Sequence, residues 1–226
     1  MTRFDMHIHT AETNDPIANI SAADIVRLYH EKGYDGIVIT DHFSLPLRNW
    51  LREELRGMTH AQMIDRWMKG YRNAKEVGDR IGCTVLLGME LRFQDSLNDY
   101  LIYGLDEYFL KNNPPLDYLD LDELNRIKTD DMLIYQAHPF RPNMVVGFPE
   151  KTFGVEVHNG AISAERNYMA DVWADTFHLH KISGSDFHHI SQLAKGGLDF
   201  YDDIRTQEAF LDALRNDRYQ LIKEPV

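Results

Sequence analysis

Histidines and carboxylates stand at the ends of short apolar segments throughout this chain. In chain order these positions are His7-Ile8-His9, Asp41-His42, Glu90, His138-Pro139 and Asp186-Phe187-His188. Imidazole nitrogens and carboxylate oxygens are the ligands that Zn, Mn and Fe use in hydrolytic centres. Groups so far apart in the sequence meet only if the fold brings the ends of several strands to one place. This requirement constrains the fold more than any other feature of the chain.

An alternation of strand-like and helix-like segments meets that requirement. The expected strands cover residues 4–8, 36–40, 84–87, 100–103, 132–136, 154–157 and 181–183. The expected helices cover residues 22–32 after Ser21, 59–81 from Thr59, 117–128, 162–178 and 206–216, and residues 43–57 form either a lid or a short helical insertion. Such alternation indicates a mainly parallel sheet. We therefore predict one α/β domain, residues 1–226, closed as a barrel with the candidate ligands at the carboxyl ends of its strands.

Composition narrows the possible partners and the compartment. The formal net charge of −12 argues against a nucleic-acid partner, because polyanions need a basic surface. A small phosphorylated substrate stays compatible with that charge, since bound cations reverse the local sign. A single cysteine, Cys83, precludes an intramolecular disulfide and fits a reducing compartment. No apolar run has membrane-spanning length, and His7 stands where a secretion segment would lie. We expect a cytoplasmic protein with no membrane partner.

The pair His7 and His9 is the sharpest local signal. Residues i and i+2 of a strand point to the same side, so both imidazoles can bind one cation. Glu90 follows a buried strand, where an unpaired carboxylate is costly and bridging two cations would remove the cost. Each position also has a simpler explanation, such as an exposed strand face for the histidines or a turn cap for Asp41 and Asp186.

Neighbouring residues are expected to orient the ligands. Asp5 and Asp41 each precede a candidate ligand, and such carboxylates commonly accept the free ring N–H of a ligating histidine. Pro139 is expected to hold His138 in an extended conformation and so to orient its ring.

Taken together, the motifs resemble those of the PHP family (polymerase and histidinol phosphatase). They read Asp5-Met6-His7-Ile8-His9-Thr10, Thr40-Asp41-His42, Gly88-Met89-Glu90, Ala137-His138-Pro139 and Gly184-Ser185-Asp186-Phe187-His188. The resemblance covers residues 5–188 and implies a distorted (β/α)7 barrel that holds two or three divalent transition metals, Zn, Mn or Fe. It also implies that His7, His9, Glu90 and Asp186 hold one cation, that Glu90 and His138 share a second, and that His42 and His188 hold a third.

The chain departs from the family pattern at two places. Relatives often carry Ser-Asp-Gly or a histidine after the first motif, and another histidine shortly after the bridging glutamate. The corresponding stretches here are Ala11-Glu12-Thr13-Asn14-Asp15-Pro16 and Ser96-Leu97-Asn98-Asp99-Tyr100. The residues open as replacements are Glu12, Asn14, Asp15, Asn98, Asp99 and Asp106.

For function, the resemblance implies a free-standing phosphoesterase. A metal-bound hydroxide would cleave the phosphate ester of a small phosphorylated molecule. Arg141 is the first candidate for binding the phosphate, because a guanidinium pairs with it bidentately. Arg48, Arg52 and Arg92 are weaker candidates that surface ion pairs would also explain. Two alternatives stay open, a metal-dependent amidohydrolase acting at a carbonyl carbon and a non-catalytic metal-stabilised module.

Overall fold

The computed structural model describes residues 1–225, and this part of the chain contains one ten-stranded sheet. The strand order is β10-β9-β1-β2-β4-β5-β6-β7-β8, and β3 pairs with β4 beside this path. The strands are β1 (Thr2–Ile8), β2 (Gly36–Ile39), β3 (His42–Phe43), β4 (Thr84–Arg92), β5 (Asp99–Tyr103), β6 (Leu133–Gln136), β7 (Gly154–Asn159), β8 (His180–Gly184), β9 (Gly196–Phe200) and β10 (Tyr219–Lys223).

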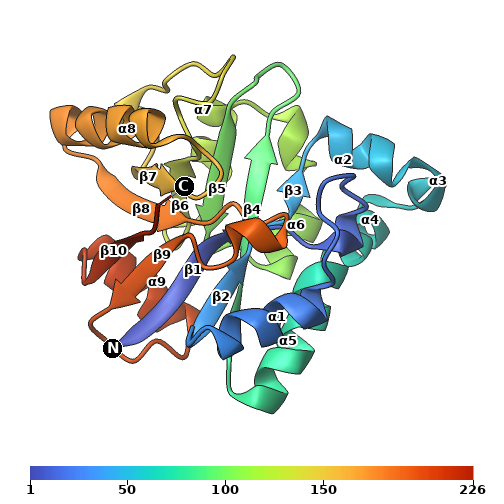
Figure 1. Cartoon of the computed structure of the whole chain (residues 1–226). Coiled ribbons are helices and arrows are strands. Elements are labelled where there is room, and N and C mark those ends of the chain that lie inside the picture. The colour runs from blue at the N-terminus through green and yellow to red at the C-terminus, as the bar shows by residue number, and fades with distance from the viewer. Residues whose placement is uncertain (226) are drawn as a thin grey trace.

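The sheet curls until β1 lies close to the segment that follows β8 (Figure 1). His9 donates its backbone N–H to the carbonyl of Phe187 at 3.0 Å, and Phe187 donates to the carbonyl of His7 at 3.1 Å. These parallel bridge contacts nearly close the barrel between its first and eighth strands. The predicted distorted α/β barrel is therefore confirmed.

Three strands differ from the expected parallel order. β5 runs antiparallel to both β4 and β6, because only the short segment 93–98 separates it from β4 and no crossover helix intervenes. β9 and β10 form an antiparallel pair that extends the sheet beyond β1. The sequence analysis did not anticipate β10 or β9, which begins with Gly196 and Gly197, residues that weaken a strand pattern.

Helices pack outside the barrel, with α1 beside α5 below β2 and with α8 next to β7 (Figure 1). Their bounds are α1 (Ala22–Glu31), α2 (Leu45–Trp50), α3 (Arg52–Leu55), α4 (His60–Trp67), α5 (Lys69–Ile81), α6 (Glu107–Asn112), α7 (Leu121–Ile127), α8 (Ala164–Phe177) and α9 (Gln207–Arg215), with short 3₁₀ turns at Ala11–Thr13, Leu116–Tyr118, Pro149–Lys151 and Ile190–Gln192. No helix within residues 1–225 has the length and apolarity needed to cross a bilayer.

Capping residues in the sequence predicted the starts of two helices correctly, whereas other helix boundaries differ from the prediction. Ser21 caps α1 through the backbone N–H of Asp24, and Thr59 begins α4 in a capping box with Gln62, as predicted. The expected long helix over residues 59–81 is instead two helices that meet at Met68. Residues 43–57 form the helical insertion rather than an irregular lid, through α2 and α3.

Strand β1 connects the core to the barrel end. Its apolar residues Phe4, Met6 and Ile8 are fully buried, and His7 and His9 alternate with them and are equally inaccessible. Because neighbouring side chains of a strand point to opposite sides, one set packs in the hydrophobic core while the other lies among polar groups.

Candidate metal centre

All seven predicted ligands converge at one end of the barrel. They form three groups whose donor atoms lie within 4.8 Å of one another, and these groups are His7, His9 and Asp186; His7, Glu90 and His138; and His9, His42 and His188. Six of the seven residues are buried, and His42 is partly exposed toward a cavity. Residues from positions 7 to 188 thus share one site.

Each candidate ligand is placed by a strand or by the turn that follows one. His42 of β3 pairs in register with Glu90 of β4, so the two side chains leave neighbouring strands side by side. Glu90 lies within β4 rather than after it, because this strand continues to Arg92. Asp186 follows β8 with a φ of 52°, in the left-handed region that turns its carboxylate back toward β1.

His138 corrects one expectation. Its φ is 25°, so the residue is not extended despite the following Pro139. The backbone N–H of His138 donates to Glu156 Oε2 at 2.9 Å, which holds this strained turn in place. Its ring then reaches Glu90, with His138 Nε2 at 2.9 Å from Glu90 Oε1.

Distances around His7 and His9 match those between ligands of one cation. His7 Nε2 lies 3.5 Å from Asp186 Oδ1 and 3.5 Å from Glu90 Oε1, while His9 Nε2 lies 3.3 Å from Asp186 Oδ1 and 3.3 Å from Glu90 Oε2. Two atoms bound about 2.1 Å from one tetrahedral cation lie roughly 3.4 Å apart. The four side chains therefore surround a space of the size that a divalent transition metal occupies.

Unpartnered buried atoms concentrate at the same place. Of the eight buried side-chain nitrogen and oxygen atoms without a hydrogen bond in residues 1–225, six belong to this site, namely His7 Nε2, His9 Nδ1, His9 Nε2, Asp15 Oδ2, Glu90 Oε2 and His188 Nε2. Leaving one such atom unpaired costs about 1–3 kcal/mol. Divalent cations would satisfy several of these atoms at once, so the donor set fits them.

The electrostatics give Glu90, Asp186 and His9 the protonation states that metal ligands need, whereas at His7 and His138 the lowering of the pKa by burial is outweighed by nearby carboxylates, which raise it. Burial lowers the pKa of His9 well below its usual value, and the nearby His42 and His188 lower it further, so this imidazole is neutral. Burial opposes ionisation of Glu90 and Asp186, but the surrounding histidines outweigh it and hold both pKa values well below normal. Burial would also lower the pKa of His42, yet Glu90 and Asp15 raise it to about 10, so a cation must displace a proton there.

Asp15 joins the site as an eighth residue. Its buried Oδ2 lies 3.4 Å from His42 Nε2 and 3.6 Å from His188 Nε2. The other residues considered as substitutes for the missing family ligands do not contact His42 and His188 in this way. Asp99 Oδ2 is 3.8 Å from His138 Nε2, whereas Glu12, Asn14, Asn98 and Asp106 bind Ala22, Glu54, Val145 and Phe109 respectively.

Glu156, in the middle of β7, was not identified as a site residue in the sequence analysis. Its Oε1 lies 2.9 Å from His7 Nδ1, and its Oε2 accepts from the backbone of His138 and from Asn159 Nδ2, both at 2.9 Å. A charged residue between Val155 and Val157 in a buried strand was the available signal.

The expected role of Asp5 and Asp41 is wrong. Asp5 accepts from the backbone of His7 and Ser185 and from Tyr29 Oη, and Asp41 accepts from the backbone and hydroxyl of Thr10. Both carboxylates therefore brace the loops that carry the ligands rather than the imidazole rings.

A cavity of about 390 Å³ opens onto the centre. Asp15, His42, Glu90, Asp186 and His188 line one part of it. The rest includes two arginines and several apolar side chains, namely Arg92, Arg141, Trp50, Ile17 and Ile162. The predicted phosphate ligand Arg141 thus lies in the same cavity as the candidate metal ligands.

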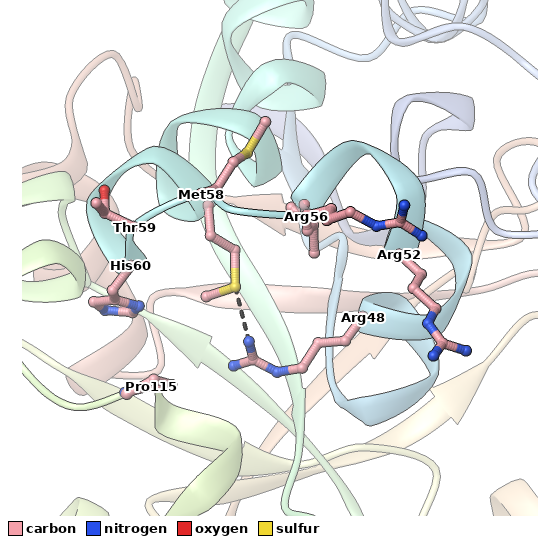
Figure 2. A pocket seen from close by; sticks show the side chains of 9 residues that line it. Arg48, Arg52, Arg56, Met58, Thr59, His60 and Pro115 are labelled. Carbon is pink, nitrogen blue, oxygen red and sulfur yellow. Dashed lines mark hydrogen bonds between the residues drawn. The ribbon is translucent and has the colours of Figure 1, made fainter.

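Arg48 of α2 and Arg52 of α3 line a different pocket (Figure 2). Arg48 turns toward Pro115 and His60, while Arg52 and Arg56 point away from them (Figure 2). Arg48 Nε donates to the buried carboxylate of Asp117 at 2.7 Å. The ion-pair explanation therefore holds for Arg48, and neither Arg48 nor Arg52 lines the cavity at the centre.

Comparison with known proteins places this barrel in a structural class. Residues 164–219 match the family model described as PHP-associated. No curated protein matches the sequence. A two-domain protein from Bacteroides vulgatus, described as containing a predicted PHP-like metal-dependent phosphoesterase, superposes with a TM-score of 0.69 at 18% identity, over 99% of this chain and 65% of that one. The chain thus spans less than two thirds of that protein.

Two further structures share the fold. An amidohydrolase from Chromobacterium violaceum, solved with bound sulfate and no metal, has a TM-score of 0.60 at 16% identity, over 93% of this chain and 96% of that one. Endonuclease Q, solved with a 27-mer duplex carrying an abasic lesion at its active site, has a TM-score of 0.59 at 15% identity, over 95% of this chain and 56% of that one. The chain therefore shares its fold with these proteins, and the match over residues 164–219 together with these structures supports the predicted resemblance to the PHP family.

The endonuclease corrects one prediction. The net charge of −12 was taken to exclude a nucleic-acid partner, yet endonuclease Q, which shares this fold over 56% of its length, is solved in complex with a DNA duplex. Net charge describes the whole surface, whereas cations and arginines set the potential inside one cavity. The exclusion of nucleic acid is therefore withdrawn.

Proposed function

We propose that this protein is a metal-dependent hydrolase that cleaves phosphate esters. One observation carries the proposal, namely that the cluster of unpartnered buried ligand atoms opens onto a cavity that also contains Arg92 and Arg141. Cations and guanidinium groups in one cavity suit a substrate with concentrated negative charge. The phosphoesterase description of the Bacteroides protein, with the same fold, supports this hydrolase assignment.

The proposed metal ligands follow the geometry. His7, His9, Glu90 and Asp186 hold one cation, and Glu90 with His138 contributes to a second. His42 and His188 hold a third, with Asp15 as the added carboxylate. We propose two or three ions of Zn, Mn or Fe, since imidazole and carboxylate suit these metals. When bound, such cations lower the pKa of water and neutralise charge on the phosphate. Arg141 is the proposed phosphate ligand.

The proposed substrate is a phosphate ester on a small molecule. A cavity of about 390 Å³ accommodates a compact ligand, at the lower end of the range for small-molecule sites. Amide hydrolysis is the second candidate, because one structure of this fold is described as an amidohydrolase. The sulfate in that structure is a tetrahedral dianion like phosphate, and the two arginines of this cavity also favour an ester of phosphate.

A single domain and a cytoplasmic location also stay proposals. The single cysteine, Cys83, is buried, which fits a reducing compartment.

Phosphate release from a panel of substrates tests the proposal. The panel contains phosphorylated metabolites, assayed by phosphate release, and abasic-site DNA, assayed by strand cleavage because a cut diester releases no inorganic phosphate. Each is assayed with Mn or Zn supplied, and an amide series is assayed beside them. His9→Ala should abolish release, whereas His30→Ala, at an exposed position of α1, should leave it unchanged. Metal-loaded protein that cleaves amides and releases no phosphate would replace this proposal by the amidohydrolase. Release that survives His9→Ala would show that another site is responsible.

A further inference from the structure

Two arginines of the cavity share one buried carboxylate. Asp99, at the start of β5, is 1% exposed and pairs in register with Arg92 of β4. Arg92 donates through Nε to Asp99 Oδ1 and through Nη2 to Oδ2, each at 2.6 Å. Arg141 Nη1 lies 3.6 Å from the same Oδ2. A single carboxylate thus gathers two guanidinium groups at the wall of the cavity.

The surrounding backbone fixes this arrangement. Asn98 Oδ1 accepts from the backbone of Val145 at 2.9 Å, and Gln136 Nε2 donates to the Val145 carbonyl at 2.8 Å. Arg141 donates its own backbone N–H to the carbonyl of His138 at 2.9 Å. The loop that carries Arg141 is therefore attached both to the ligand His138 and to the strand end that carries Asp99.

Both arginines retain capacity to bind a ligand. A guanidinium has five N–H donors in a fixed fork, and Arg92 uses only its Nε and Nη2 groups on Asp99. The Arg141 side chain is 44% exposed, so it stands at the rim, while the Arg92 side chain is 27% exposed and lies deeper. Glu90, Asp186 and His188 line the same cavity as both arginines.

We propose that Arg92 and Arg141, positioned by Asp99, form the subsite for a terminal phosphate, so that the protein prefers phosphate monoesters to diesters. This inference rests on the proposed phosphoesterase function. A monoester offers three non-bridging oxygens and up to two negative charges, enough for cations on one side and two guanidinium groups on the other. A diester has one non-bridging oxygen fewer, carries one charge, and places a second substituent where a guanidinium would lie. Asp99 is a positioning residue, since Arg92 occupies both of its oxygens.

Matched esters and inorganic phosphate test the subsite. The metal-loaded protein is assayed with p-nitrophenyl phosphate and bis(p-nitrophenyl) phosphate, and phosphate binding is measured by calorimetry. Arg141→Gln should raise KM for the monoester and weaken phosphate binding by about tenfold or more, with a smaller change in kcat and in diester cleavage. Arg141→Lys should restore part of the loss, and Arg52→Gln in the separate pocket is the matched control.

Asp99→Asn distinguishes positioning from metal binding. It should weaken phosphate binding as Arg141→Gln does, while elemental analysis finds the metal content of the unaltered protein. Loss of metal in Asp99→Asn would overturn the positioning role, and diester cleavage that equals or exceeds monoester cleavage would overturn the terminal-phosphate subsite while leaving the phosphoesterase intact. If neither ester is cleaved but phosphate binding still depends on Arg141, the subsite is supported and the proposed function fails.

Discussion

Glu156 is one side chain that contacts or connects several of the proposed metal ligands. Its carboxylate contacts the His7 ring, the backbone of His138 and the side chain of Asn159, while Asn159 also donates to Asp186 Oδ2 at 3.2 Å. A hydrogen bond to Nδ1 fixes the tautomer of His7, so that Nε2 faces the proposed cation. Glu156 therefore connects ligands from three different parts of the chain.

Glu156→Gln should weaken metal binding without removing a ligand. An amide has one oxygen and one NH₂ group, so whichever way it turns, a donor faces a donor. We expect metal affinity to fall about 10–100-fold. Competition with a fluorescent chelator measures the affinity, and Glu31→Gln, at an exposed position of α1, serves as the control. An affinity equal to that of the unaltered protein would show that Glu156 does not orient His7.

The candidate residues that combine ligand chemistry with a position at a strand end do lie together in the structure, and their role as metal ligands stays a prediction. His7, His9, His42, Glu90, His138, Asp186 and His188 combine ligand chemistry with strand ends, and the structure brings all of them together. Glu156 lies mid-strand, and Asp15 lies in a turn, where aspartate ordinarily has a structural role. Only the three-dimensional arrangement distinguishes these two carboxylates from their many equivalents in the sequence.

Helix α5 supports the site through a close approach at Gly70. A Cβ at this buried position would collide with Asp41 Oδ2 and Thr10 Oγ1, which hydrogen-bond to each other at 2.8 Å. The segment after His9 and the segment before His42 are joined by that bond. The absence of a side chain at Gly70 therefore lets α5 pack directly behind two ligand-bearing segments.

Gly70→Ala should destabilise the protein, against the usual trend for helices. Alanine improves helix propensity by about 1 kcal/mol. Here overpacking against a buried carboxylate should cost about 1–3 kcal/mol and outweigh that gain. Urea denaturation measures the free energy of unfolding, with Lys69→Ala at the exposed neighbouring position as the control for propensity. An alanine variant as stable as the unaltered protein would mean that α5 can shift away at no cost.

Element prediction failed where tertiary contacts decided the outcome. The apolar pattern of residues 100–103 identified β5 but not its antiparallel direction, which follows from the short connection to β4. The pattern over residues 59–81 continued across Met68, where the chain nevertheless begins a new helix. Hydrophobic periodicity predicts which face of a helix or strand is buried. It does not predict the direction of a strand, or where one helix ends and a second, similarly buried helix begins.

Several acidic side chains of this protein are concentrated at one end of the barrel. Asp15, Glu90, Asp186 and Glu156 are all buried there together with four histidines and the partly exposed His42, although unpaired charges are costly in such surroundings. Histidines alone cannot satisfy this set, because six buried atoms remain unpartnered. We therefore expect cations to complete the fold at this end, so that removal of metal destabilises the whole protein.

Metal content and thermal stability, measured on the same sample, test this expectation most directly. We expect at least two equivalents of Zn, Mn or Fe per chain by elemental analysis. Prolonged treatment with a chelator should lower Tm by roughly 5–10 °C, since cations at a hundredfold excess over Kd add about 2.7 kcal/mol to stability. Asp186→Asn should reduce both the metal content and the shift in Tm. A chain that holds no stoichiometric metal after Mn and Zn are supplied, and whose Tm does not respond to the chelator, would contradict the account.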